Sequence, residues 1–173
     1  MTKELRILIL EDEPADAVLI KHELRRGGLE FHSKRVDNQH DFMSEMRRHP
    51  PDLILSDHGL PGFDGFTALA LARGRRPGVP FIFVSGSRNL QAVIETLKQG
   101  ADAYVFKDRL ATSLVPAVRR VLRDNRGRRR RGRRGMTAPK RGVELDSLLG
   151  KLRSFSGLLL VGITWGLEGL LWK

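Results

Sequence analysis

Short apolar runs that alternate with segments of helical period constrain the fold of this chain more than any other feature. Four runs are almost entirely aliphatic or aromatic and one is more polar, and in chain order they are residues 5–10, 31–36, 53–55, 79–84 and 103–106. Near-continuous apolar strands are typical of parallel sheets that helices cover on both faces. The more polar run, residues 31–36, suits a strand at the edge of such a sheet.

The segments between and after these runs have the spacing of amphipathic helices. The first opens with Pro14, a residue suited to a first helical turn, and ends before Gly27 and Gly28. The apolar positions that mark the other helices are Phe42 and Met46; Phe66, Leu69 and Ala70; Leu90, Val93, Ile94 and Leu97, ended by Gly100; and Leu114, Val118, Val121 and Leu122. If Ser113 is the cap of the last helix, Pro116 falls in its first turn, where the missing N–H does no harm.

Five strand–helix units in about 125 residues predict an α/β fold, a doubly wound five-stranded parallel sheet with right-handed crossovers. In the order 2-1-3-4-5 the polar second strand lies at an edge. Ligands then bind beyond the carboxyl ends of the first and third strands, where the direction of winding reverses.

Acidic residues follow both of those strands. Glu11, Asp12 and Glu13 come directly after the first strand, and Asp57 comes directly after the third. Neighbouring parallel strands bring at least two of these carboxylates close together, and a cation or raised pKa values must relieve their repulsion. Oxygen ligands with room for water and phosphate oxygens favour Mg²⁺.

The fourth and fifth strands end in a hydroxyl and a cation, Ser85 and Lys107. With the acidic residues they describe a site for phosphoryl transfer. An oxygen of Asp57 can attack a phosphoryl group in line and form an acyl phosphate, while metal and lysine neutralise charge on the other phosphoryl oxygens. The Gly- and Pro-rich turn that follows Asp57 lets the chain leave the sheet sharply.

Each of these residues has a simpler interpretation. Asp57 could form a turn, Glu11 and Asp12 could cap the first helix, Ser85 could be a turn serine, and Lys107 a surface lysine. Their joint occurrence at successive strand ends favours the site. A flavin-binding protein would need a Ser/Thr/Gly-rich phosphate loop after the first strand, and an aspartyl phosphatase usually has a second Asp where Gly59 stands here.

Four motifs, ILILEDEPAD, LILSDHGLPGFDG, FIFVSGS and AYVFKDRL, resemble those of the response-regulator receiver domain of two-component signalling. The resemblance spans roughly residues 3–124 and implies the flavodoxin-like (βα)5 fold of chemotaxis regulators. It implies a cytoplasmic response regulator that a sensor histidine kinase or histidine phosphotransfer protein phosphorylates and that then switches its interactions with a downstream protein. Such a protein is not a metabolic enzyme, although it catalyses its own Mg²⁺-dependent phosphorylation and dephosphorylation.

The resemblance also assigns roles to individual residues. Asp57 is similar to the phosphoacceptor and Glu11 and Asp12 to the acidic pair, with Asp12 as direct ligand of Mg²⁺. The carbonyl of Gly59 is similar to the third protein ligand of the metal.

Three further residues match the family's catalytic and switching positions. Ser85 resembles the hydroxyl residue that turns toward the phosphoryl group, and Lys107 resembles the family's lysine. Tyr104 resembles the aromatic residue whose rotamer reports phosphorylation, although a strand aromatic can also be a core residue. Asp108 departs from the pattern, because many receivers have a proline there after a cis bond.

Charge divides the chain into three parts. The net charge is +11, yet residues 1–118 hold 16 basic and 16 acidic residues, residues 119–142 hold 12 and 1, and residues 143–173 hold 3 and 3. We predict a receiver domain over residues 3–125, a flexible basic linker over 126–142 and an apolar, helical tail over 143–173. The receiver part is therefore neutral overall, and its composition implies no polyanionic ligand.

The two C-terminal parts leave the output of the protein open. The linker is either a solvated tether or a segment that binds the phosphates of nucleic acid or of an anionic membrane. Residues 155–172 carry one charge, Glu168. They could form a helix that docks on a partner or self-associates, anchor the chain in a membrane, or be a disordered or truncated remnant of a longer, kinase-like protein. An alternative function is thus a scaffold or anchor that acts through this tail. The chain has no cysteine and no secretory signal at its N-terminus, so we expect the receiver domain inside the cell.

Overall fold

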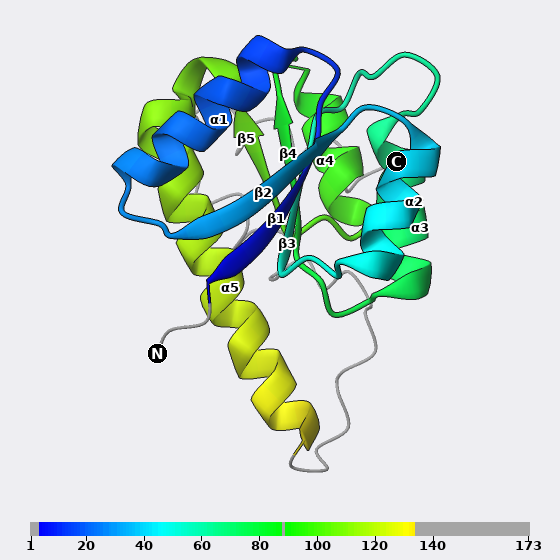
Figure 1. The fold of residues 1–173 in the computed structure, drawn as a ribbon, viewed down its shortest axis with the longest axis vertical. Helices are drawn as coiled ribbons and strands as arrows, with labels where there is room; N and C mark the ends of the chain where they lie inside the picture. Colours follow the sequence, from blue (N-terminus) through cyan, green and yellow to red (C-terminus); the bar gives the residue numbers. More distant parts are fainter. Residues whose placement is uncertain (1–3, 88, 134–173) are drawn as a thin grey trace, which may run out of the picture. The chain divides into compact units, whose positions relative to one another are not determined.

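The computed structural model describes residues 4–87 and 89–133, with side chains as far as Arg130. Its sheet consists of five parallel strands in the order β2-β1-β3-β4-β5, as predicted (Figure 1). The strands are β1 (Leu5–Leu10), β2 (Phe31–Val36), β3 (Leu53–Ser56), β4 (Phe81–Ser85) and β5 (Ala103–Phe106). Strand β4 starts two residues later than expected, since Pro80 has no N–H to donate to a ladder.

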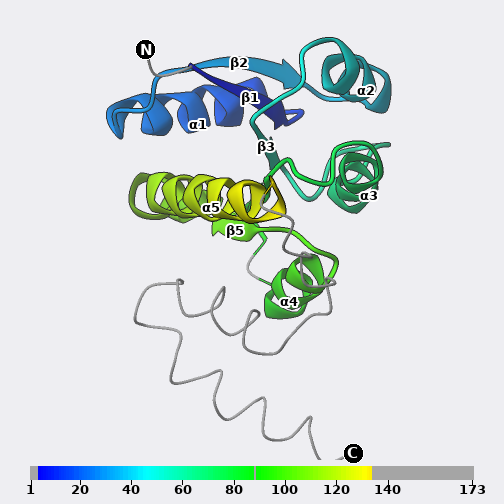
Figure 2. The ribbon, with the colours of Figure 1, turned by 90° about the horizontal axis from the view of Figure 1, so that it is seen from below.

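Helices cover both faces of the sheet, and Figure 2 shows α1 and α5 on one side with α2, α3 and α4 on the other. Their bounds are α1 (Pro14–Arg26), α2 (Gln39–Arg48), α3 (Gly65–Arg75), α4 (Leu90–Lys98) and α5 (Leu110–Arg133). Alternate strand residues face each layer. One core cluster joins Ile9, Leu55 and Val84 of the sheet to Leu24 of α1 and Leu114 of α5.

Helix α1 has the predicted bounds, but neither Glu11 nor Asp12 is its cap. Glu13 is the N-cap residue, and its side chain accepts a hydrogen bond from the N–H of Ala15. The interpretation of Glu11 and Asp12 as caps is therefore wrong. Oε1 of Glu11 accepts a hydrogen bond from the N–H of Glu13 at 3.3 Å, which leaves its Oε2 and the Asp12 carboxylate for another role.

Helix α5 differs from the prediction at both of its ends. A 3₁₀ turn over Lys107–Arg109 runs directly into the helix at Leu110, so Ser113 is not the cap and Pro116 lies inside the helix. The earlier start has a physical reason, because Leu110 is 4% exposed and extends the buried row of Leu114 and Val118 by one turn. All peptide bonds described, including that between Lys107 and Asp108, are trans.

The C-terminal end of α5 changes the predicted domain boundary. The helix continues to Arg133, so residues 126–133 of the expected linker are helical and continuous with the receiver domain. The remainder of the linker and the predicted tail, residues 134–173, lie outside the described residues. Of the helices in the described part, none is both long and apolar enough to cross a bilayer.

Candidate functional site

The carboxyl ends of β1 and β3 bring three of the predicted carboxylates together. Leu10 and Ser56 are partners in the parallel ladder, and the ladder extends one residue further because the N–H of Asp57 donates to the carbonyl of Leu10 at 2.8 Å. Carboxylate oxygens of Glu11, Asp12 and Asp57 all lie within 4.8 Å of one another. The predicted acidic cluster is confirmed in its geometry.

Glu11 is the buried member of this cluster. It is fully shielded from solvent, and burial raises the pKa of its carboxyl above the ordinary value, with the charge of Asp57 acting in the same direction. Its Oε2 lies 2.8 Å from Nζ of Lys107 but accepts no well-aligned hydrogen bond from the described residues. This contact is therefore an ion pair without an aligned hydrogen bond, which leaves a buried carboxylate oxygen with unused acceptor capacity.

Lys107 is the cation of the site and contacts three carboxylates. Its Nζ lies 2.6 Å from Oδ2 of Asp16, 2.8 Å from Oε2 of Glu11 and 3.2 Å from Oδ2 of Asp57. Burial acts to lower the pKa of Lys107, but the carboxylates of Asp16, Glu11 and Asp57 outweigh it and raise that pKa above its ordinary value. Lys107 is thus a fixed positive charge beside Asp57.

Asp57 is held rigidly but still reaches solvent. Its side chain is 15% exposed, and its Oδ1 accepts a hydrogen bond from the N–H of His58 at 2.6 Å. The His58 ring packs edge-on against Phe66 and Phe83 and does not join the acidic cluster. At Gly65 a Cβ would lie 2.7 Å from the Asp57 carbonyl oxygen and 2.4 Å from Phe83, so the start of α3 needs a glycine to pack beneath the acidic residue.

Ser85 and Tyr104 lie at the same edge of the sheet and are linked through Ser87. The Ser85 hydroxyl accepts a hydrogen bond from the N–H of Ser87, and the Tyr104 hydroxyl donates to the Ser87 carbonyl at 3.1 Å. The Tyr104 ring is 2% exposed and stacks on Phe83 at 6.4 Å between centroids, so it is a core residue in this conformation. A switching role for Tyr104 and a metal-binding role for the Gly59 carbonyl remain predictions.

Two residues of the site were not predicted from the sequence. Asp16, in the first turn of α1, forms the shortest contact to Lys107, and Arg35 of β2 donates to the carbonyls of Glu11 at 2.8 Å and Asp12 at 3.2 Å. Arg35 thereby holds the loop that carries the acidic pair. Two features of the sequence could have indicated them. Asp16 is an acid in the first turn of a helix that starts at the site, and Arg35 is a cation next to the end of the strand that neighbours β1.

We predict that Asp16→Asn lowers the pKa of Lys107, because it removes the carboxylate that lies nearest to the ammonium group, at 2.6 Å. The loss of stability at neutral pH should be about 1 kcal/mol or less, since Asp16 is 36% exposed and water screens the pair. The raised pKa means that the ion pairs stabilise the fold below the ordinary value of 10.5 and cease to do so as the pH rises through the folded value. The variant should therefore lose this contribution at a lower alkaline pH than the parent.

NMR titration of the Lys107 side chain and urea unfolding at several alkaline pH values measure the two effects. Asp124→Asn, a change of an exposed acid on α5, is the matched control. An unchanged Lys107 titration in Asp16→Asn would mean that the Asp16 contact does not contribute in solution.

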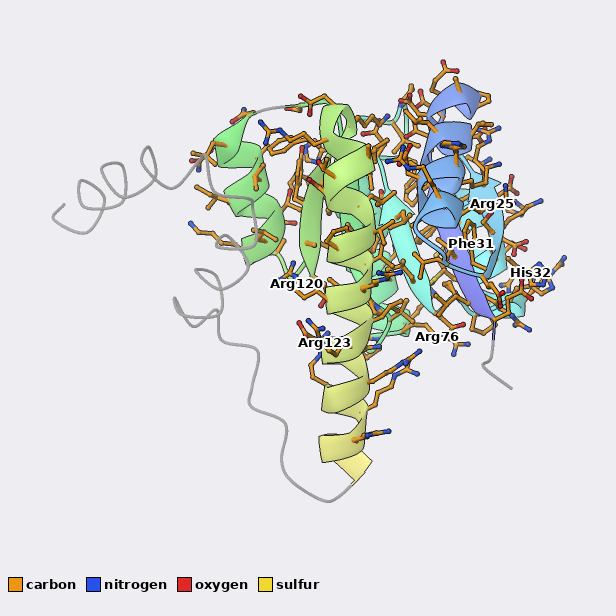
Figure 3. All side chains as sticks on the ribbon, turned by 90° about the vertical axis from the view of Figure 1, so that its left-hand side faces the viewer. Arg25, Phe31, His32, Arg76, Arg120 and Arg123 are labelled. Carbon is orange, nitrogen blue, oxygen red and sulfur yellow. The ribbon has the colours of Figure 1, made fainter. Side chains whose placement is uncertain are left out.

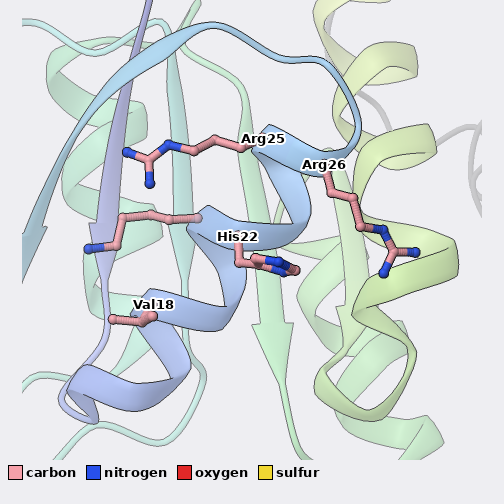
Figure 4. A pocket seen from close by; sticks show the side chains of 5 residues that line it. Val18, His22, Arg25 and Arg26 are labelled. Atoms are coloured by element: carbon pink, nitrogen blue, oxygen red, sulfur yellow. The ribbon is translucent and has the colours of Figure 1, made fainter.

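The structure also has an open hollow on the outer side of α1, lined by Val18, Lys21, His22, Arg25 and Arg26 (Figure 4). None of these side chains belongs to the acidic cluster or contacts Lys107 in the described residues. Val18 is 59% exposed, so the hollow is a surface feature. It adds no chemistry to the site.

The acidic residues fit a hard divalent cation. Glu11, Asp12 and Asp57 provide oxygen ligands from two adjacent strand ends, and the under-coordinated Oε2 of Glu11 is a lone-pair donor that Lys107 does not fully satisfy. Within the part of the chain that the structure describes, this is the one such group of carboxylates. Together with Asp16 it carries four negative charges against the single charge of Lys107, an imbalance that a divalent ion offsets.

Comparisons with known proteins agree with this geometry. The family model of the response regulator receiver domain matches residues 7–119. The DNA-binding response regulator MtrA of Mycolicibacterium smegmatis is 32% identical over 124 residues, which are 72% of this chain and 53% of that protein. The nitrogen assimilation regulatory protein NtrX of Azorhizobium caulinodans is 30% identical over 151 residues, 86% of this chain and 33% of that protein.

A solved structure has the same fold over nearly its full length. The CheY-like receiver domain protein from Methanospirillum hungatei superposes with a TM-score of 0.63 at 27% identity, covering 72% of this chain and 98% of that one. By contrast, the chain spans only about half the length of relatives such as MtrA, with 53% covered. The order of the strands, the acidic residues at their ends and the match over residues 7–119 lead to one conclusion: the chain belongs to the response regulator receiver domain family.

Proposed function

We propose that the protein is a phosphorylation-driven switch in which Asp57 accepts a phosphoryl group from a phosphohistidine of a sensor histidine kinase or phosphotransfer protein. One observation carries the proposal. The Asp57 carboxylate shares a cluster with Glu11 and Asp12 and has the Lys107 ammonium 3.2 Å from its Oδ2. A nucleophile, a metal-binding group and a fixed cation are the parts that phosphoryl transfer to a carboxylate requires.

In the proposed step an oxygen of Asp57 forms a bond to phosphorus while the bond from phosphorus to the donor's imidazole nitrogen breaks. The imidazole keeps the electron pair and takes up a proton. Lys107 neutralises negative charge next to Asp57, and Arg35 keeps the loop of Glu11 and Asp12 in place through its hydrogen bonds to their carbonyls.

Glu11, Asp12 and Asp57 would hold Mg²⁺, with the Gly59 carbonyl as a further ligand. The ion supplies Lewis-acid neutralisation of charge on the phosphoryl oxygens when it is bound. The buried Glu11, whose Oε2 already lies 2.8 Å from the Lys107 ammonium, would then gain a second positive charge nearby, which lowers the cost of keeping it ionised.

Phosphorylation would change partner binding through Ser85 and Tyr104. Both hydroxyls already contact Ser87, so a phosphoryl group that takes the Ser85 hydroxyl as a donor would disturb the contacts that hold the Tyr104 ring. In this proposal the chain is a cytoplasmic switch and not a metabolic enzyme. Its only catalysis is its own phosphorylation and dephosphorylation.

The test is phosphate incorporation from acetyl phosphate, followed by intact mass and by release with hydroxylamine, which cleaves an acyl phosphate but not a serine or threonine phosphate. We expect the mass of the parent protein to increase by one phosphoryl group when Mg²⁺ is present and to remain unchanged when a chelator removes it. Incorporation that is independent of Mg²⁺, or a hydroxylamine-resistant product, would contradict the proposal.

A further inference from the structure

The excess positive charge of the chain begins on an ordered helix. From Arg119 to Arg134 the sequence has ten arginines, no lysine and one acid, Asp124. Helix α5 carries this segment as far as Arg133 and runs beyond the ends of the strands (Figure 1). The basic segment is therefore not only a linker, because residues 119–133 belong to a defined helix.

The arginines of residues 123–130 lie on two different sides of helix α5. At 100° per residue, Arg123, Arg126 and Arg130 fall within about 60° of arc and cover roughly 10 Å along the axis. The buried side chains of Val118, Val121 and Asn125 lie on the opposite side. Figure 3 shows Arg123 on the lower part of α5. We call Arg123, Arg126 and Arg130 the arginine stripe.

The arginines on the packed side are tied to the domain. Arg128 pairs with Asp102 at 3.0 Å, and Arg129 donates to the Gly78 carbonyl at 3.5 Å. Asp102 also pairs with Arg73 of α3 at 2.8 Å and accepts from the N–H of Phe81. These contacts fix the rotation of α5, so that the stripe faces solvent.

The stripe itself has no such compensation. Arg123, Arg126 and Arg130 are exposed, and none of them forms an ion pair with any residue among 4–87 and 89–130. Their spacings of three and four residues bring like charges together along the helix, which is unfavourable in the free protein. A partner with regularly spaced negative charges would remove this repulsion.

We propose that the arginine stripe binds the phosphate backbone of double-stranded nucleic acid without sequence preference. Guanidinium groups bind phosphate oxygens in a bidentate manner, and the segment has only arginine as its cation. A membrane is the less suitable partner, because residues 123–130 include no apolar side chain to insert and the other side of α5 packs on the domain. Contacts to phosphates give affinity but no sequence choice.

The test compares full-length protein with two variants of equal charge. Arg123→Gln/Arg126→Gln/Arg130→Gln removes the stripe and keeps good helix formers, and Arg47→Gln/Arg48→Gln/Lys98→Gln removes three exposed cations elsewhere. The probes are fluorescent DNA duplexes of two unrelated sequences, the corresponding RNA duplex, a single strand, and vesicles of phosphatidylcholine and phosphatidylserine. Anisotropy or co-sedimentation is followed as a function of salt.

We expect the parent and the control variant to bind both duplexes equally and with a steep salt dependence. Loss of three phosphate contacts should lower the slope of log affinity against log salt by about 2.7, so between roughly 50 and 200 mM salt the parent loses about 40-fold more affinity than the stripe variant. A weaker response with the single strand would fit its lower charge density.

Three results would overturn the proposal. The first is that the stripe variant and the control variant have the same salt slope. The second is that the protein binds the anionic vesicles but not the duplexes, and the third is that it binds one of the two DNA sequences more tightly than the other. The proposal does not depend on phosphorylation at Asp57. Failure of the acetyl phosphate experiment and failure of the stripe are therefore separate outcomes.

Discussion

Asp57→Asn should lose all Mg²⁺-dependent, hydroxylamine-sensitive phosphate incorporation while it remains fully folded. The amide has the shape of the carboxylate but is a poor nucleophile toward phosphorus. It also removes one negative charge from a cluster in which Glu11, Asp12 and Asp57 lie within 4.8 Å, so repulsion in the metal-free protein falls. The change also removes the Lys107–Asp57 ion pair at 3.2 Å, which opposes that gain, so loss of labelling should accompany a free energy of unfolding close to that of the parent.

The combination of both measurements distinguishes chemistry from structural damage. Labelling is followed by intact mass and stability by urea unfolding without Mg²⁺. Asp124→Asn, which changes an exposed acid far along α5, is the matched control and should be labelled like the parent. If Asp57→Asn takes up hydroxylamine-sensitive phosphate to the same level, another carboxylate of the cluster is the acceptor and the assignment of Asp57 fails.

The core of this site could be predicted because parallel strands align their carboxyl ends. Given the order of the strands, residues directly after β1 and β3 must be neighbours, and the ladder contact from the Asp57 N–H to the Leu10 carbonyl shows that they are. Lys107 follows β5 by the same rule. Its contacts to Glu11 and Asp57 thus result from topology more than from local sequence.

Asp16 and Arg35 were harder to find because neither directly follows a strand at the predicted switch point. Asp16 reaches Lys107 from the first turn of a helix, and Arg35 reaches the carbonyls of the acidic loop from within the edge strand. Both contacts depend on the direction of a long or exposed side chain. Composition and period do not determine that direction.

Helix α5 was misjudged for a different reason. A run of Arg and Gly has the composition of a flexible linker, but arginine is a good helix former, and the structure adds tertiary contacts that the composition does not reveal. Arg128 with Asp102 and Arg129 with Gly78 join residues far apart in the chain. The predicted boundary at residue 125 therefore fell inside a helix that continues to Arg133.

Lys107→Met should reduce the free energy of unfolding of the metal-free protein by about 3 kcal/mol at neutral pH. Methionine is close to lysine in length, so packing is largely retained, but three carboxylates within 3.2 Å of the lost ammonium become unpaired. The side chain of Lys107 is only 17% exposed and that of Glu11 only 1%, so water compensates little of the loss. Urea unfolding of parent and variant measures the difference.

The pH and metal dependence of that loss identify its cause. Burial raises the pKa of Glu11, so its folded form takes up a proton more readily than its unfolded form, and lowering the pH from neutral toward the ordinary value of 4.5 favours the folded state. The variant, which lacks the opposing ammonium, should gain more from acidification than the parent. Excess Mg²⁺ should also restore more stability to the variant, because the ion replaces the missing positive charge and binds only the folded cluster.

Lys98→Met, the same substitution at an exposed lysine of α4, should show none of these effects. A deficit in Lys107→Met that persists unchanged at low pH and with saturating Mg²⁺ would mean that the loss arises from packing around the 3₁₀ turn over Lys107–Arg109 and the start of α5. In that case Lys107 would not act as the charge that balances the acidic cluster, and its role beside Asp57 in phosphoryl transfer would lose its physical basis. A deficit that disappears under both conditions assigns the stabilisation to charge balance alone.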